Sequence, residues 1–214
     1  MGLPFTDEQF FRIFADYNGA FWPVVVALWL ASLEAIVFVR RNPEGRSHVL
    51  SFFLGALWLW NALAYHAFLF TRINPAAWLF SALFAVQALL FFRAGVRRQI
   101  EYFLASGLPQ AAGLGLVAYA LAYPFLTLAF GHSYPAAPTF GVPCPTAILT
   151  IGLLVTARGG VPLALAIVPL AWGVVGGSAA VLLAVPADYV LLGAGALLTV
   201  ILIGQRMRPR PEVG

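Results

Sequence analysis

The chain contains no lysine and a single cysteine among its 214 residues, and only 9% of its residues are charged. The absence of lysine excludes a retinal protein, because a retinal Schiff base needs a lysine amine inside the helical bundle. One cysteine excludes an internal disulfide, a CxxC redox pair and a multi-cysteine zinc site. Any chemistry at Cys144 therefore needs partners of other residue types.

Apolar residues make up most of the chain. Hydrophobic residues account for 62% of it and the mean hydropathy is +0.90, whereas soluble domains carry about 25% charged residues. The composition predicts an integral membrane protein whose main partner is the lipid bilayer, with no nucleic acid involved. The length suits one compact bundle rather than several domains.

Seven apolar segments are candidates for membrane crossing, since a spanning helix needs about 20 mainly apolar residues. The sequence thus predicts an all-α, polytopic seven-transmembrane-helix bundle, in which the fifth segment is short. The segments cover residues 20–39, 48–70, 75–94, 109–131, 144–157, 161–183 and 187–204.

The two ends of the chain differ from the bundle at 20–204. Residues Thr6 to Gln9 have the form of a capping box, and Phe10, Phe14 and Tyr17 share one helical face. This pattern predicts a short amphipathic helix at 1–19 whose aromatic face lies in the membrane interface. Residues 205–214 form an arginine- and proline-rich tail, and Asp188 is expected to cap the last helix.

The arginines are distributed unevenly between the two sides of the predicted membrane. Ten follow the odd-numbered segments, whereas only Arg12 and Arg72 fall on the other side. Loops rich in arginine stay in the cytoplasm. The predicted N-terminus is therefore outside and the C-terminus cytoplasmic. The ten are Arg40, Arg41, Arg46, Arg93, Arg97, Arg98, Arg158, Arg206, Arg208 and Arg210.

In this topology His66, His132 and Cys144 share the outer leaflet. Cys144 lies in PTFGVPCPTAILT, residues 138–150, where two prolines without amide protons predict an irregular start to the fifth helix. Two histidines and one cysteine suit zinc or copper, so the three residues are a candidate metal site. The alternative is that each one has only a structural role.

Further polar residues are candidates for substrate binding. Asn61 and Tyr65 lie one helical turn apart on the second segment, and Arg72 and Asn74 follow it on the outer side. Glu34 is a carboxylate inside the first segment, where it could relay protons, bind a cation or pair with an arginine.

Two stretches carry a resemblance to a known family. AYHAFLFTRINPAAWLFSALF at 64–84 and GHSYPAAPTFGVPCPTAILTIGLL at 131–154 resemble an uncharacterised family of small bacterial polytopic membrane proteins, a domain of unknown function. The resemblance implies a multi-pass protein of the bacterial inner membrane. It implies no activity and no catalytic residues.

Three functions are compatible with these observations. The first is a transporter or ion-handling protein with an outward-facing His/Cys pocket for a small solute or a transition metal ion. The second is a membrane-embedded, metal-dependent hydrolase that acts on lipid. The third is a non-catalytic membrane partner whose polar residues only join helices. The sequence leaves oligomerisation open.

Overall fold

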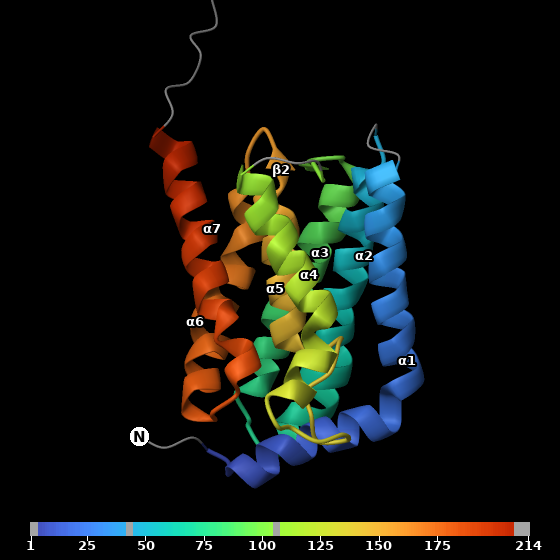
Figure 1. Ribbon diagram of the computed structural model, residues 1–214, viewed down its shortest axis with the longest axis vertical. Coiled ribbons are helices and arrows are strands. Elements are labelled where there is room, and N and C mark those ends of the chain that lie inside the picture. The colour runs from blue at the N-terminus through green and yellow to red at the C-terminus, as the bar shows by residue number, and fades with distance from the viewer. Residues whose placement is uncertain (1–3, 42–44, 105–107, 208–214) are drawn as a thin grey trace, which may run out of the picture.

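The computed structural model describes residues 4–41, 45–104 and 108–207, and the chain folds into a bundle of helices (Figure 1). The seven predicted segments correspond to α1–α7, and most boundaries agree within a few residues. The α-helices are α1 (Asp7–Arg41), α2 (Ser47–Trp60), α3 (Ala77–Val96), α4 (Leu108–Ala129), α5 (Pro143–Val155), α6 (Leu163–Leu182) and α7 (Val190–Met207). A π-helix, η1 (Asn61–Leu69), and a 3-10 turn, η2 (Phe70–Arg72), continue α2, and the 3-10 turn η3 (Pro186–Asp188) precedes α7.

Six helical segments of the described chain are long and apolar enough to cross a membrane. The exception is α5, which has 13 residues. At 1.5 Å per residue it is about 20 Å long, against about 30 Å of hydrocarbon. The six segments are Asp7–Arg41, Ser47–Arg72, Ala77–Val96, Gln110–Ala129, Leu163–Leu182 and Pro186–Met207.

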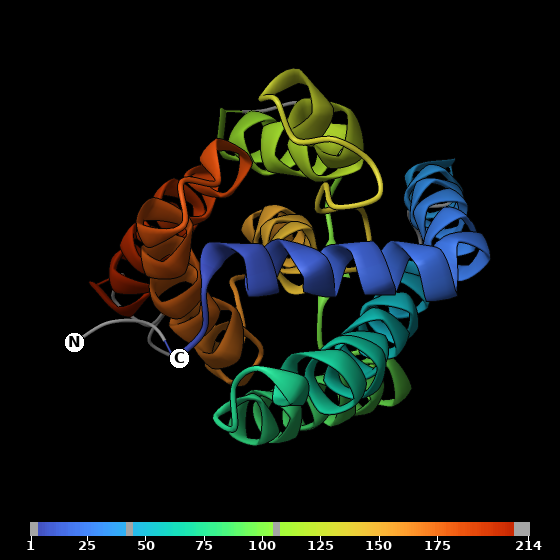
Figure 2. The same ribbon diagram turned by 90° about the horizontal axis from the view of Figure 1, so that it is seen from below.

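The short helix α5 occupies the centre of the bundle, and the longer helices surround it (Figure 2). Every α5 residue except Cys144 is buried, which agrees with a helix that is apolar on all sides. Two hydrogen bonds from α2 and η1 hold it in place. The Trp58 Nε1 donates to Thr150 at 2.9 Å, and the Asn61 amide donates to Thr146 at 3.0 Å.

The first helix is longer than predicted. The capping box is confirmed, because Gln9 N donates to Thr6 Oγ1 and Thr6 N donates to Gln9 Oε1. However, α1 continues without interruption from Asp7 through Pro23 to Arg41. Its first part lies across one end of the bundle and its second part runs along the side (Figures 1 and 2).

The aromatic face of this first part contacts the bundle. Phe14 and Tyr17 are buried against the bundle, so these two rings contact protein, and the interfacial position of the helix stays a prediction. The end of the bundle offers these rings an apolar surface. The Tyr17 hydroxyl also donates to the Gly141 carbonyl at 2.9 Å and accepts from Trp60 Nε1 at 2.7 Å.

Asn18 joins α1 to the loop between α4 and α5. Its amide nitrogen donates to the carbonyls of Pro135 at 2.6 Å and Ala137 at 2.9 Å, and its Oδ1 accepts from the Thr139 hydroxyl. Asn18 is buried. If its amide were removed, water could not easily take over its hydrogen bonds to these loop groups.

We therefore expect Asn18→Ala to lower the free energy of unfolding by about 1–3 kcal/mol, the cost of leaving buried polar groups unpaired. Thermal unfolding in detergent measures this loss. The matched control is Asp16→Asn, on the same helix, which removes only an exposed ion pair with Arg72 and should change stability by less than about 1 kcal/mol. Equal melting temperatures for Asn18→Ala and Asp16→Asn would show that the loop is held by other contacts.

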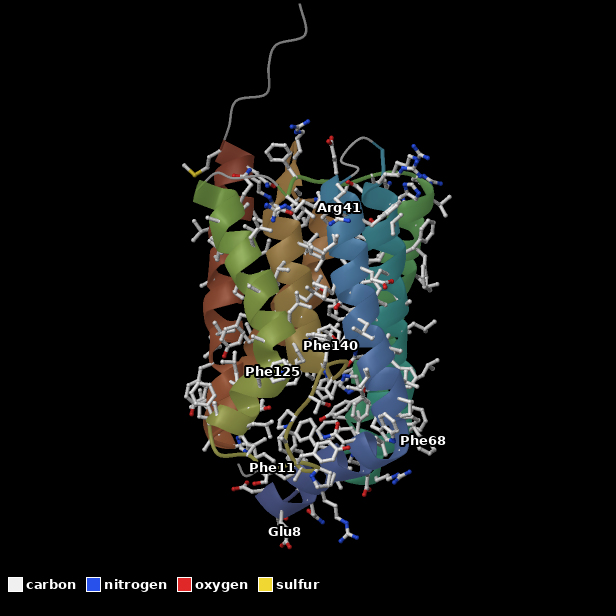
Figure 3. The ribbon with its side chains drawn as sticks, turned by 45° about the vertical axis from the view of Figure 1, so that its right-hand side comes forward. Glu8, Phe11, Arg41, Phe68, Phe125 and Phe140 are labelled. Carbon is white, nitrogen blue, oxygen red and sulfur yellow. The ribbon has the colours of Figure 1, made fainter. Side chains whose placement is uncertain are left out.

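The opposite end of the bundle is closed by two short strands, β1 (Glu101–Tyr102) and β2 (Ala157–Arg158), which pair antiparallel. Tyr102 N donates to the Ser47 hydroxyl at 3.0 Å. Burial raises the pKa of the Tyr102 phenol, which keeps it protonated beside Ser51. Arg41 lies at this end and Glu8 at the other (Figure 3).

Candidate functional site

A cavity of about 410 Å³ lies beneath the first part of α1, at the end of the bundle where Glu8 and Phe11 are found (Figure 3). Eight elements and the loops next to them contribute to its wall: α1, η1, η2, α3, α4, α5, α6 and η3. The wall consists of Phe5, Phe10, Phe14, Tyr65, Phe70, Asn74, Phe80, Tyr123, Val142, Pro143, Cys144, Trp172, Val174, Val175, Gly176, Ser178, Ala179, Ala180, Leu182, Val185 and Asp188. The volume falls in the range of small-molecule sites, which is about 300–1,000 Å³.

Asp188 supplies the only charge among the described residues of this wall. Its side chain is buried, and the Tyr123 hydroxyl donates to its Oδ1 at 2.5 Å. The ion pairs found among the described residues, Arg72 with Asp16 and Arg158 with Glu101, do not involve it. Asp188 is thus a buried carboxylate with a neutral partner, and ionisable groups inside membranes usually mark functional sites.

The N-terminus of α5 forms the floor of the cavity. Val142 is its extended N-cap, with φ −93° and ψ 167°, and no side chain caps the helix there. Of the first three residues only Cys144 has an amide proton, since Pro143 and Pro145 have none. The Cys144 side chain lies within interaction range of the Asp188 carboxylate.

The π-helix η1 sets the position of Tyr65 on the cavity wall. Segments of π-helix are rare and often occur at functional sites. The neighbouring His66 is not part of the cavity wall and lies among aromatic rings, with Phe84 at 4.5 Å and Trp172 at 5.3 Å between centroids. It is fully buried, and neither ring nitrogen has a hydrogen-bond partner among the described residues.

The predicted metal ligands are not brought together. Cys144 lines the cavity, His66 lies in its aromatic surroundings, and His132 packs on Phe11 at 5.0 Å between centroids. Within residues 4–41, 45–104 and 108–207, no three side chains of His, Cys, Asp and Glu form a group that could hold a metal ion. The structure therefore gives no support to zinc or copper binding by this trio. The physical reason is that agreement in depth does not fix the direction in which helix faces point.

The five predicted substrate-binding residues separate into two groups. Tyr65 and Asn74 line the cavity, and Asn61 is buried nearby against Thr146. Arg72 instead lies exposed beside Asp16, its guanidinium 4.9 Å from the centre of the Phe68 ring. Glu34 is exposed on α1 and lines a surface hollow with Arg41, so neither of these two charges reaches the cavity.

Sequence reasoning missed the two residues that give the cavity its polar centre. Asp188 was assigned only to cap the last helix, yet its carboxylate accepts a hydrogen bond from Tyr123, 65 residues away. The available signal was that Asp188 is the one carboxylate in the apolar stretch 161–204. Tyr123 carried no such signal, because a tyrosine in an apolar helix is common at membrane interfaces.

Comparison with known proteins identifies the chain at family level. A family of unknown function, DUF6064, matches residues 7–212. The chain belongs to this family. The match covers all seven α-helices, so every residue of the cavity wall except Phe5 lies inside the matched region. No curated protein and no solved structure matches the chain.

Proposed function

We propose that this DUF6064 protein spans a bacterial inner membrane with its N-terminus outside and its C-terminus in the cytoplasm, and that it carries a small solute through an outward-facing cavity. The six long apolar helices support the membrane assignment. Arg41, the last residue of α1, lies at the end of the bundle opposite the cavity (Figure 3), which supports the orientation. Arg40 precedes it in α1, and Arg46 precedes α2. In this topology α5 and the loop before it complete a seventh crossing.

The buried carboxylate in an otherwise apolar cavity is the observation that carries this proposal. A protein that only scaffolds other helices gains nothing from a buried charge without a countercharge, which is expensive to keep away from water. A solute-binding site has a use for it, because a few polar groups in an apolar pocket set orientation and specificity.

Helices α6 and α7 pack closely beside the cavity. Gly173 of α6 packs against Gly195 of α7, where a Cβ on Gly173 would lie 3.5 Å from the Gly195 Cα. Pro169 lies inside α6. Small residues permit close backbone approach and a proline permits a bend. We propose that a bend at Pro169 lets the α6 wall of the cavity respond to a solute.

A cavity-blocking substitution tests this function. Ser178 of α6 lines the cavity, and Ser178→Trp fills part of it. Val181→Trp is the matched control, because Val181 is exposed on the same helix and is absent from the wall. Purified proteins are screened by thermal unfolding against organic cations, organic anions and neutral apolar compounds.

We expect at least one compound class to raise the melting temperature of the wild type and of Val181→Trp, since a ligand that binds only the folded state stabilises it. The same class should not stabilise Ser178→Trp. Uptake of a radiolabelled member of that class into proteoliposomes then tests whether the protein transports it. The proposal fails if no compound class separates Ser178→Trp from Val181→Trp.

A further inference from the structure

We infer that the solute of this cavity is a lipophilic cation, whose charged group pairs with Asp188 while its apolar part lies against the aromatic wall. The inference rests on the proposed function and names the class of molecule that the cavity accepts. Three features of the wall lead to it: its single charge, its aromatic rings and the nature of the α5 N-terminus.

The charge of the wall is negative. Asp188 is its only charged side chain among the described residues, and the hydroxyl of Tyr123 is a neutral partner. A buried carboxylate is favourable only when a countercharge or several hydrogen bonds compensate it. Tyr123 and Cys144 supply neutral partners to Asp188, but no described residue forms an ion pair with it, so a countercharge would come from a group that enters the cavity.

The aromatic rings of the wall favour the same sign of charge. Phe10, Phe14 and Phe70 form a cluster, with ring centroids of Phe10 and Phe14 5.0 Å apart and those of Phe10 and Phe70 6.3 Å apart. Tyr65 stacks on Phe70 at 5.7 Å. The faces of aromatic rings carry negative electrostatic potential and attract cations, and this attraction strengthens when the cation loses its water.

An anion is the competing possibility, since helix N-termini attract negative charge. The α5 N-terminus is a poor anion site because two of its first three residues, Pro143 and Pro145, lack the N–H groups that bind anions. Asp188 would also repel an anion at close range. A neutral apolar molecule fits the rings but leaves the carboxylate unpaired.

The cavity also gives a lipophilic molecule a path of access. Its wall includes Val174 and Leu182 of α6, which are 66% and 68% exposed on the outer face of the bundle. The cavity thus reaches the surface that we assign to the lipid. An amphiphilic cation can enter from the outer leaflet without crossing bulk water.

Two probes of the same shape and opposite charge test the inference. Tetraphenylphosphonium and tetraphenylborate are titrated in separate samples of the purified chain, and binding is followed by the melting temperature. We expect tetraphenylphosphonium to stabilise the protein saturably and tetraphenylborate to have no such effect. Equal stabilisation by both ions would overturn the inference, because the cavity would then select only for apolar character.

Substitution of the carboxylate identifies the site. Asp188→Asn keeps the shape and the hydrogen bond from Tyr123, and we expect it to weaken tetraphenylphosphonium binding at least tenfold, since removal of one member of a buried charge pair has a large effect. Asp188→Glu keeps the charge and should bind more tightly than Asp188→Asn. Asp16→Asn removes an exposed carboxylate at the same end and should bind like the wild type.

The outcomes separate the two proposals. Undiminished binding in Asp188→Asn overturns the cation inference, and so does equal loss of binding in Asp16→Asn. If Asp188→Asn does not fold, the comparison of the two probes on the wild type and on Asp188→Glu decides. If only anions or neutral compounds distinguish Ser178→Trp from Val181→Trp, the inference falls while the proposed carrier function stands.

Discussion

Gly113→Ala should destabilise the bundle by about 1–3 kcal/mol, and Gly113→Leu should prevent α4 from packing on α5. A Cβ on Gly113 would lie 2.6 Å from the Gly152 carbonyl oxygen and 2.8 Å from Thr156 Cγ2. Gly152 makes the reciprocal contact, because its own Cβ would lie 2.8 Å from the Gly113 carbonyl oxygen. Backbone atoms of two packed helices cannot move apart without losing their other contacts, so overpacking here carries the usual penalty.

Gly115 provides the control on the same helix. No atom lies within 4 Å of the place where its Cβ would be, and alanine is favoured over glycine in a helix by about 0.5–1 kcal/mol. Gly115→Ala should therefore melt at the wild-type temperature or above it. If thermal unfolding in detergent gives Gly113→Ala and Gly115→Ala the same melting temperature, the close approach of α4 and α5 is wrong.

This contact matters for the site as well as for stability. The same helix, α5, carries Cys144 into the cavity wall beside Asp188. Displacement of α5 by the methyl group that Gly113→Ala adds should move the floor of the cavity. We therefore expect Gly113→Ala to weaken any ligand that stabilises the wild type, even at temperatures where the variant is still folded.

Trp58→Ala should have the second large effect, and we expect it to lower the free energy of unfolding by about 3 kcal/mol. Trp58 is fully buried, its ring packs on Phe84 at 4.4 Å between centroids, and its Nε1 donates to Thr150. Replacing a buried tryptophan with alanine usually costs about 3–5 kcal/mol. The lower end applies to the proposed membrane location, where the loss is one of packing and hydrogen bonding rather than of transfer from water.

Trp78→Ala is the comparison for this substitution, since Trp78 is 63% exposed on α3. Its removal should change the melting temperature little. Trp58→Phe should fall between the two, because it keeps an apolar ring against Phe84 and leaves the Thr150 hydroxyl without its donor. A Trp58→Ala variant as stable as Trp78→Ala would contradict the central position of α5.

The sequence predicted the helices well because long apolar runs leave few ways to pair the backbone. Long apolar runs must form helices so that their backbone groups are paired, and the segments at 75–94 and 161–183 became α3 and α6 with small shifts. The short fifth helix at 144–157 was also recognisable, since Pro143 and Pro145 mark its start. It is observed as Pro143–Val155.

The arrangement of the helices could not be read in the same way. Helical periodicity is weak in segments that are apolar on all sides, so the directions of His66 and Cys144 were undetermined by sequence. The contacts of the first helix were missed for a related reason: an amphipathic aromatic face fits the headgroup region and the end of a bundle equally well. The position of the Tyr17 side chain is set by its hydrogen bonds with Gly141 and Trp60. These partners are distant in the sequence, so no local pattern encodes them.

The site was predicted only where its residues are unusual for a membrane helix. Tyr65, Asn74 and Cys144, which the sequence placed toward the same end of the helices, line the cavity. Asp188 was recognised as polar but assigned a local role, because its partner Tyr123 lies on a different helix. Long-range pairs of this kind depend on which helices are neighbours, and a single sequence does not contain that information.

Labelling of a cavity cysteine from one side of the membrane is the most direct test of the proposed outward-facing cavity. Cys144 is the only cysteine, so Cys144→Ser gives a blank background in which Ser178→Cys reports on the cavity wall. Gln99→Cys, between α3 and β1, reports on the arginine-rich end. Intact cells that express each variant are treated with a membrane-impermeant maleimide.

We expect Ser178→Cys to be labelled from outside the cell and to be protected from labelling by tetraphenylphosphonium. Gln99→Cys should be labelled only after the cells are permeabilised. Labelling of Gln99→Cys from outside, with Ser178→Cys accessible only from the cytoplasm, would contradict the outward-facing cavity.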